Sequence, residues 1–241
     1  MLTSLAGGRL LADKHGATPP AVVALHGWAR TGADFAPILE GLDAVAVHFP
    51  GFGTADPPPE AWGSPEYADL VAEAIMPFAP VVVVGHSFGG RVAVRLAANY
   101  PNLVSALVLT GVPLVRLAPT AKPALSFRLV RWLAGRKLLP ASALEKQRQK
   151  RGSADYNAAQ GIMREILVKV VNENYDDDLA RVTAPVHMVW GEHDTAAPMP
   201  AGDAASRLLP NATFRFVGGA GHLLEGALRD EVRAELLEVL P

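Results

Sequence analysis

The 241-residue sequence contains no cysteine, few charged residues and no long apolar run. Without cysteine, disulfides, thiolate metal sites and a cysteine nucleophile are excluded. No stretch reaches the ~18 to 20 uncharged apolar residues of a membrane-spanning helix, and residues 1–11 lack the basic, apolar and small-residue zones of a signal peptide. We therefore expect no membrane span and a cytoplasmic location.

Charge is scarce and nearly balanced. Asp, Glu, Lys and Arg together make up 19% of the chain, and the formal net charge is -2 at pH 7. The sequence thus lacks the global basic field on which nucleic-acid binding relies, and we expect no nucleic-acid partner. Apolar residues make up 50%, which is enough for the core of one large α/β domain.

Six short apolar runs, each ending at glycine or proline, predict buried β-strands at 21–25, 44–47, 81–84, 103–109, 186–190 and 214–217. Helical spacing occurs between and after them, at 35–42, 66–78, 88–99, 204–209 and 225–240. This alternation predicts an α/β fold with a mostly parallel sheet covered by helices on both faces. Residues 3–15 suggest a short N-terminal hairpin.

The alternation breaks over residues 112–181. Helix-like segments occur there at 125–133, 142–150 and 155–171, without a convincing buried strand. We predict a helical lid inserted into one core, which comprises residues 1–111 and 182–241.

A G-x-S-x-G motif, Gly85 to Gly89, lies between the predicted strand 81–84 and the predicted helix 88–99. Such a motif forms a sharp, strained turn that presents the serine hydroxyl above the sheet, and its glycines avoid side-chain clashes. The alternative is that Ser87 merely caps the helix. The strand–turn–helix context favours Ser87 as a nucleophile.

A serine nucleophile needs a histidine base and an acid that orients the histidine. His222 follows the strand at 214–217, and Asp194 follows the strand at 186–190, in the order serine, acid, histidine. His193 is an alternative base. Glu192 and the acidic run 176–178 are alternative acids, although the run is expected to be a solvated surface loop.

Attack by serine on a carbonyl also requires two donors for the oxyanion. One candidate is the backbone N–H of Phe88, the residue after the nucleophile. The second is the backbone N–H of Trp28, in the loop after the strand at 21–25. His26 in the same loop is expected to brace the loop rather than to act as a second base.

Together these segments resemble the α/β-hydrolase family, in its lid-bearing esterase-like branch, which includes pimeloyl-carrier-protein methyl esterases and other carboxylesterases. The motifs occur in order as His26-Gly27-Trp28, Pro50-Gly51-Phe52-Gly53, Gly85 to Gly90, Gly191-Glu192-His193-Asp194 and Gly221-His222. His48 and Ala55 depart from the aspartate and serine often found near the Pro-Gly turn, which puts local hydrogen bonding in doubt. Serine at position 87 argues against haloalkane dehalogenases and epoxide hydrolases.

The resemblance implies hydrolysis of a carboxylic ester through an acyl-enzyme on Ser87, without a cofactor or a metal. The substrate would be a small-molecule or carrier-bound ester. A carbon–carbon bond hydrolase or a thioesterase could use the same triad. A ligand receptor that kept the fold and lost turnover is an alternative of another class, but such receptors usually lack a triad member. The sequence does not set the oligomeric state.

The predicted lid is strongly basic. Between Pro113 and Gly152 it carries ten Lys or Arg against one acid, Glu145. These charges are either the solvated faces of amphipathic helices or a surface that attracts an anionic substrate or carrier, as similar lid surfaces do in the family's pimeloyl-carrier-protein methyl esterases.

Overall fold

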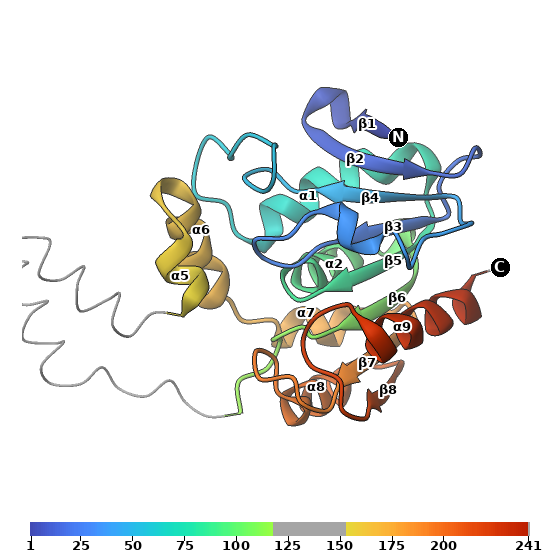
Figure 1. Cartoon of the computed structure of the whole chain (residues 1–241), viewed down its shortest axis with the longest axis vertical. Helices are drawn as coiled ribbons and strands as arrows, with labels where there is room; N and C mark the ends of the chain where they lie inside the picture. Colours follow the sequence, from blue (N-terminus) through green and yellow to red (C-terminus); the bar gives the residue numbers. More distant parts are fainter. Residues whose placement is uncertain (118–152, 241) are drawn as a thin grey trace, which may run out of the picture.

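A computed structural model describes residues 1–117 and 153–240 and contains an eight-stranded sheet with helices on both faces (Figure 1). The strands are β1 (Leu2–Leu5), β2 (Leu10–His15), β3 (Val22–Leu25), β4 (Ala44–His48), β5 (Val81–His86), β6 (Val104–Thr110), β7 (Val186–Gly191) and β8 (Ala212–Val217). Their order across the sheet is β1-β2-β4-β3-β5-β6-β7-β8. Strands β3 to β8 pair in parallel, whereas β1 and β2 form the antiparallel hairpin expected at 3–15. The predicted α/β fold is confirmed.

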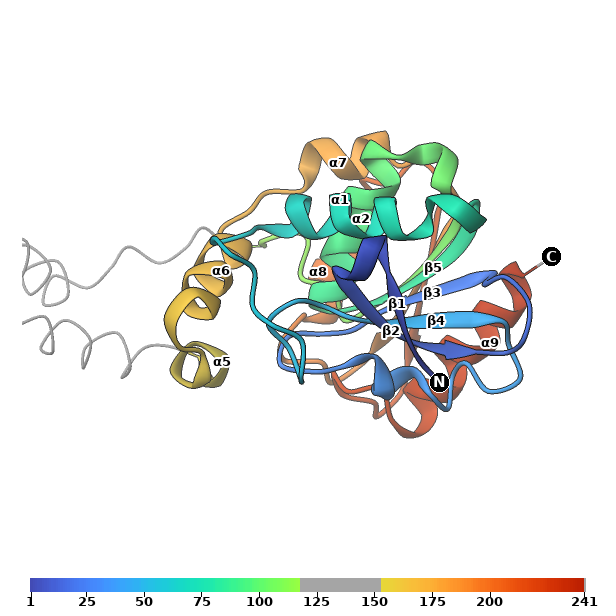
Figure 2. The same ribbon diagram turned by 90° about the horizontal axis from the view of Figure 1, so that it is seen from above.

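Alternate residues of the central strands pack on opposite faces of the sheet. Val83 and Leu107 belong to the core beneath α1 (Ser64–Ile75) and α2 (Phe88–Asn99). Val82 and Val108 belong to the second core, beneath α9 (Gly226–Val239). Figure 2 shows α1 and α2 on one side of the sheet and α9 on the other. Because both faces are covered, these strands are continuous apolar runs rather than alternating ones.

Several predicted elements differ in the structure. Residues 35–42 form no α-helix: a 3-10 helix (Gly32–Phe35) is followed by turns, in which the N–H groups of Ile38 and Leu39 both donate to the carbonyl of Phe35. The spacing still predicted burial correctly, since all three side chains are buried. The helix predicted at 204–209 is α8, which begins and ends earlier (Met199–Ser206).

Strand β8 was predicted to be buried, and this is wrong. It lies at the edge of the sheet, and Phe216 on it is 60% exposed. A run such as Phe214 to Val217 does not reveal its position in the sheet, because an edge strand can carry the same residue types as a buried one.

The described part of the predicted lid contains α5 (Ala154–Ala158), α6 (Gly161–Val171) and α7 (Asp176–Arg181). The helix expected over 155–171 is therefore two helices, with a break after Ala158 where Ala159 and Gln160 take extended backbone conformations. The helices expected at 125–133 and 142–150 lie outside the described residues.

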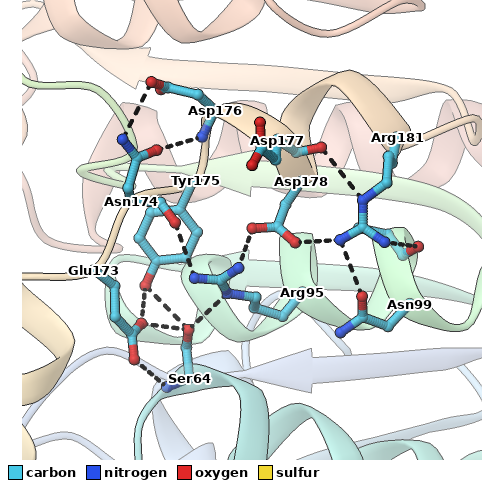
Figure 3. Close-up of polar contacts among 11 residues, drawn as sticks. Ser64, Arg95, Asn99, Glu173, Asn174, Tyr175, Asp176, Asp177, Asp178 and Arg181 are labelled. Atoms are coloured by element: carbon cyan, nitrogen blue, oxygen red, sulfur yellow. Dashed lines mark hydrogen bonds and ion pairs between the residues drawn. The ribbon is translucent and has the colours of Figure 1, made fainter.

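The acidic run 176–178 is not a solvated loop, as was expected, because it forms the first turn of α7. Asp178 is buried and forms ion pairs with Arg95 of α2 and with Arg181 (Figure 3). The acidic first turn suits the positive end of the helix dipole. The buried pair then joins α7 to the core.

Glu173 binds the segment after α6 to the start of α1 (Figure 3). The N-cap of α1 is Gly63, which has no side chain to accept a hydrogen bond. Glu173 supplies the acceptor instead: its Oε1 accepts from the backbone N–H of Ser64 at 2.9 Å, and its Oε2 accepts from the Ser64 hydroxyl. Tyr175 donates to the same Oε2 at 2.6 Å. A carboxylate near the C-terminal end of the predicted lid thus caps α1, a helix of the core.

Candidate active site

Ser87 occupies a strained turn between β5 and α2. Its φ is 51° and its ψ is -111°, a region that residues with a Cβ rarely adopt. Its backbone N–H donates to the carbonyl of Thr110 on β6 at 3.0 Å. Although Ser87 stands at the N-cap position of α2, its side chain makes no capping hydrogen bond. Helix capping therefore does not explain this residue.

Two glycines allow the turn to form. A Cβ at Gly85 would lie 2.7 Å from the Cα of Gly90, and a Cβ at Gly89 would overlap the backbone carbonyl of Leu25 on β3. Both contacts would be closer than those that real Cβ atoms make. The glycines of the motif are thus required by the close approach of β3, β5 and α2.

The structure pairs His222 with Asp194. His222 Nδ1–H donates to Asp194 Oδ2 at 2.7 Å. The other carboxylate oxygen accepts from the N–H groups of Ala196 and Ala197 at 2.9 and 2.8 Å, and the Asp194 side chain is only 1% exposed. This hydrogen bond assigns the proton to Nδ1, so that Nε2 is left as a proton acceptor.

Gly111, which directly follows β6, leaves room for this pair. Its φ is +60°, and a Cβ there would lie 2.9 Å from His222 Nδ1 and 3.1 Å from Asp194 Oδ2. The histidine–aspartate pair therefore rests on the end of the strand next to the Ser87 turn. Within the described residues Ser87 and His222 form no side-chain hydrogen bond, a contact that in many hydrolases tightens only when substrate binds.

The alternative acids and base make other contacts. Glu192 is exposed, and its Oε2 accepts from the N–H of Gly219 at 2.9 Å. His193 is exposed, and its backbone N–H donates to the carbonyl of Ala220 at 2.8 Å. Both tie the Asp194 loop to the His222 loop. Asp178 lies in the separate ion-pair cluster on α7.

The proposed oxyanion donors have no internal acceptor. Neither the N–H of Trp28 nor that of Phe88 makes a hydrogen bond in the part of the chain that the structure describes. The Phe88 ring is buried and contacts Trp28, with ring centroids 5.6 Å apart. It also contacts three further aromatic side chains, Phe49, Phe52 and Tyr67. The sequence did not reveal this aromatic cluster, because its members come from two loops and from the helices α1 and α2, which are far apart along the chain.

His26 braces the Trp28 loop, as predicted. Its Nδ1–H donates to the carbonyl of Gly27 at 2.7 Å, and its Nε2 accepts from the N–H of Phe49 at 3.0 Å. Burial lowers the pKa of His26 from 6.5 to about 4. The ring is therefore neutral at pH 7, as these two hydrogen bonds require.

His48, which departs from the family's aspartate, keeps a hydrogen bond in its place. Its Nδ1 accepts from the N–H of Gly32 at 3.4 Å, and its Nε2–H donates to Asp13 Oδ2 at 3.0 Å. The local hydrogen bonding that the departure put in doubt is thus present with a histidine.

Two residues near the pair were not recognised in the sequence. Gly111 carries a signal, since it is a glycine directly after a buried strand. His86 is the variable position of the G-x-S-x-G motif, and its Nε2–H donates to the backbone carbonyl of His222 at 2.9 Å. Nothing in the motif indicates that contact.

In the described ranges, 1–117 and 153–240, no three His, Asp or Glu side chains cluster as metal ligands would. No helix of those ranges has the length and apolar character that crossing a bilayer demands.

Comparison with known proteins places this arrangement in a family. Residues 22–235 match the "Alpha/beta hydrolase family". The chain belongs to this family. It is 30% identical to the pimeloyl-[acyl-carrier protein] methyl ester esterase of Chromobacterium violaceum, over 84% of this chain and 87% of that protein. It is 28% identical to a 2-hydroxy-6-oxononadienedioate/2-hydroxy-6-oxononatrienedioate hydrolase of Cupriavidus pinatubonensis, over 90% and 81%.

The present chain is similar in fold to a solved esterase from Exiguobacterium antarcticum. The TM-score is 0.72 at 18% identity, and the likeness covers 98% of this chain and 97% of that one. The α/β-hydrolase fold and the esterase-like family that the sequence resembled are therefore confirmed.

Proposed function

We propose that this chain is a serine hydrolase that cleaves a carboxylic ester. The observation that carries the proposal is the hydrogen-bonded pair of His222 and buried Asp194, which lies at the strand end beside the strained Ser87 turn. Ser87, Asp194 and His222 follow the parallel strands β5, β7 and β8. The carboxyl ends of such strands are where open α/β sheets place their sites, which supports the proposal.

The chemistry follows the roles of these groups. Ser87 Oγ attacks the ester carbonyl and its proton passes to His222 Nε2, while Asp194 supports the imidazolium. The N–H groups of Trp28 and Phe88 stabilise the oxyanion. When the tetrahedral intermediate collapses, the C–O bond breaks and the alcohol leaves with the proton from His222. Water, deprotonated by His222, then cleaves the acyl-enzyme to the acid and free Ser87.

Residues 112–181 are proposed to be a lid over this site. Support comes from α6, where the sulfur of Met163 fills the space that a Cβ at Gly51 would occupy. Helix α6 therefore lies against the Pro50-Gly51 turn, next to the aromatic cluster around Phe88. Contacts of partly buried Glu173 and buried Asp178 fix the end of this segment to α1 and α2.

The substrate is proposed to be a small-molecule or carrier-bound ester. The relative from Chromobacterium violaceum is named for a carrier-bound methyl ester. The dienedioate hydrolase among the relatives keeps a carbon–carbon bond hydrolase as the second candidate, and a thioesterase would use the same residues.

The test measures release of acid from an oxygen ester, from the matched thioester and from a vinylogous 1,5-diketone acid whose hydrolysis cleaves a carbon–carbon bond. Intact-mass spectrometry after rapid quenching should detect the acyl adduct of the ester on the protein. Ser87→Ala should remove turnover and adduct, whereas Ser105→Ala, at an exposed serine of β6, should retain both. Preferred cleavage of the diketone would favour the second candidate, and no turnover of any substrate would favour a receptor.

A further inference from the structure

His86 lies between two loops of the proposed site, but the reaction described above gives it no role. It is the last residue of β5, it directly precedes Ser87, and it is 3% exposed. Its ring centroid is 4.8 Å from that of His222. On its other side, a Cβ at Gly27 would lie 2.9 Å from His86 Nδ1. The ring therefore contacts both the His222 loop and the loop that carries the Trp28 N–H.

The hydrogen bond from His86 holds the backbone of the proposed base. His86 Nε2–H donates to the carbonyl of His222 at 2.9 Å. Among the described residues this is the only hydrogen bond that the backbone of His222 makes. The loop that contains His222 follows an edge strand, whereas His86 belongs to a central strand. The contact thus ties a loop at the edge of the sheet to a central, buried strand.

Keeping a histidine here has a cost. His86 Nδ1 is buried and has no hydrogen-bond partner among the described residues, and a buried unsatisfied acceptor typically costs about 1 to 3 kcal/mol. An apolar side chain would fill the same space without that cost. Stability alone does not explain His86, but the Nε2–H contact to His222 does.

We propose that His86 is a positioning residue for the hydrolytic reaction, whose Nε2–H holds His222 at the place where its imidazole can accept the Ser87 proton. This inference rests on the proposed function. It assigns His86 no contact with substrate. A displacement of a catalytic group by about 1 Å can cost on the order of 100-fold in rate, so one backbone hydrogen bond can have a large effect on kcat.

The test compares His86→Gln with His86→Asn. The glutamine amide nitrogen can occupy the position of Nε2 and donate to the His222 carbonyl, whereas the asparagine amide reaches only the position of Nδ1. His86→Asn should lower kcat by about 10- to 100-fold with little change in KM, because proton transfer rather than substrate binding is affected. His86→Gln should recover most of kcat.

His187→Gln is the matched control. His187 of β7 donates from Nδ1 to buried Glu235 at 2.8 Å, and glutamine cannot keep that bond. This variant should lower the thermal midpoint but retain kcat. Wild-type kcat in His86→Asn, an equal loss in His86→Gln, or an equal loss in His187→Gln would each overturn the proposal.

A second readout does not depend on turnover. In the wild-type protein, ¹⁵N chemical shifts should show His86 protonated at Nε2 and not at Nδ1. The proton between His222 and Asp194 should give a downfield NMR resonance that His86→Gln keeps and His86→Asn broadens or loses. An Nδ1-protonated His86, or an unchanged resonance in His86→Asn, would contradict the inference. Full ester turnover by Ser87→Ala would instead refute the proposed function and leave this readout standing.

Discussion

Ser87 follows β5, a central strand that is buried on both faces of the sheet, whereas His222 follows β8, an edge strand on which Phe216 is 60% exposed. The Ser87 turn is shaped by the close approach of backbone segments at Gly85 and Gly89. The His222 loop is held by side-chain hydrogen bonds: His86 donates to it, and Glu192 and Asp194 accept from it. The proposed nucleophile thus depends on packing, and the proposed base depends on hydrogen bonds.

The largest expected effect distinguishes Asp194 from Glu192, the two acidic residues near His222. Asp194→Asn should lower kcat on the order of 10³- to 10⁴-fold, because His222 loses the acceptor that fixes its tautomer and supports its positive charge. Glu192→Gln, which can still accept from Gly219, should lower kcat much less. Steady-state kinetics on one ester checks both. Nearly full activity in Asp194→Asn would show that the acid is another residue.

The next effect tests whether packing shapes the nucleophile region. Alanine is a better helix former than glycine by about 1 kcal/mol, yet the Cβ of Gly89→Ala would overlap the Leu25 carbonyl. We expect the clash to dominate and to lower the free energy of unfolding by roughly 3 kcal/mol. In the base region a Cβ at Gly221 meets nothing within 4 Å, so Gly221→Ala should change stability by less than about 0.5 kcal/mol.

Urea unfolding measures both glycine variants. Equal stability of Gly89→Ala and the wild type would contradict a nucleophile turn that is fixed by close packing.

Acid should destabilise the folded protein through two buried histidines, His26 and His86. Burial lowers the pKa of His26 and of His86 from 6.5 to about 4. The unfolded chain therefore takes up protons below about pH 6.5 that the folded protein excludes until about pH 4. The free energy of unfolding should be highest above pH 6.5 and fall between pH 6.5 and 4, by up to roughly 3 kcal/mol for each histidine.

His86→Gln removes one of the two groups and should flatten this pH dependence, as measured by urea unfolding at pH 7, 5.5 and 4.5. The same slope in wild type and variant would mean that His86 is not a neutral buried group.

The smallest expected effect concerns the basic segment 113–152. This prediction rests only on the charges that the sequence places in that segment. For an anionic ester, kcat/KM should fall as ionic strength rises from ~0.01 to ~0.15 M, because the Debye length shrinks from ~30 to ~8 Å. A neutral ester of equal length should respond little. Joint replacement of Arg148, Lys150 and Arg151 by glutamine should flatten the salt response of the anionic ester. An equal response of both esters would indicate that these charges are merely solvated and do not attract an anionic substrate.

The central features were predictable because the sequence marks them locally. The Ser87 motif, the buried strands and the glycines before His222 are each visible in a few consecutive residues. The exposure of β8 was not predictable, since strand order depends on the whole chain. Nor was the burial of Asp178, because its partner Arg95 is 83 residues away. The cap that Glu173 supplies to α1 joins residues 109 apart.

The site shows the same division. Ser87, Asp194 and His222 could be proposed from order and spacing, because each follows a predicted strand. His86 could not be assigned, because its partner is a backbone carbonyl of a loop 136 residues away, and a carbonyl leaves no mark in the sequence.

The most direct test of the central claim is covalent labelling with a fluorophosphonate, followed by peptide mapping. An activated serine reacts through its hydroxyl, displaces fluoride and forms a phosphonate ester. We expect the label on Ser87 alone, with labelling strongly slowed in His222→Ala and absent in Ser87→Ala. Labelling of a different serine, or unchanged labelling in His222→Ala, would contradict the assignment of Ser87 as a nucleophile activated by His222.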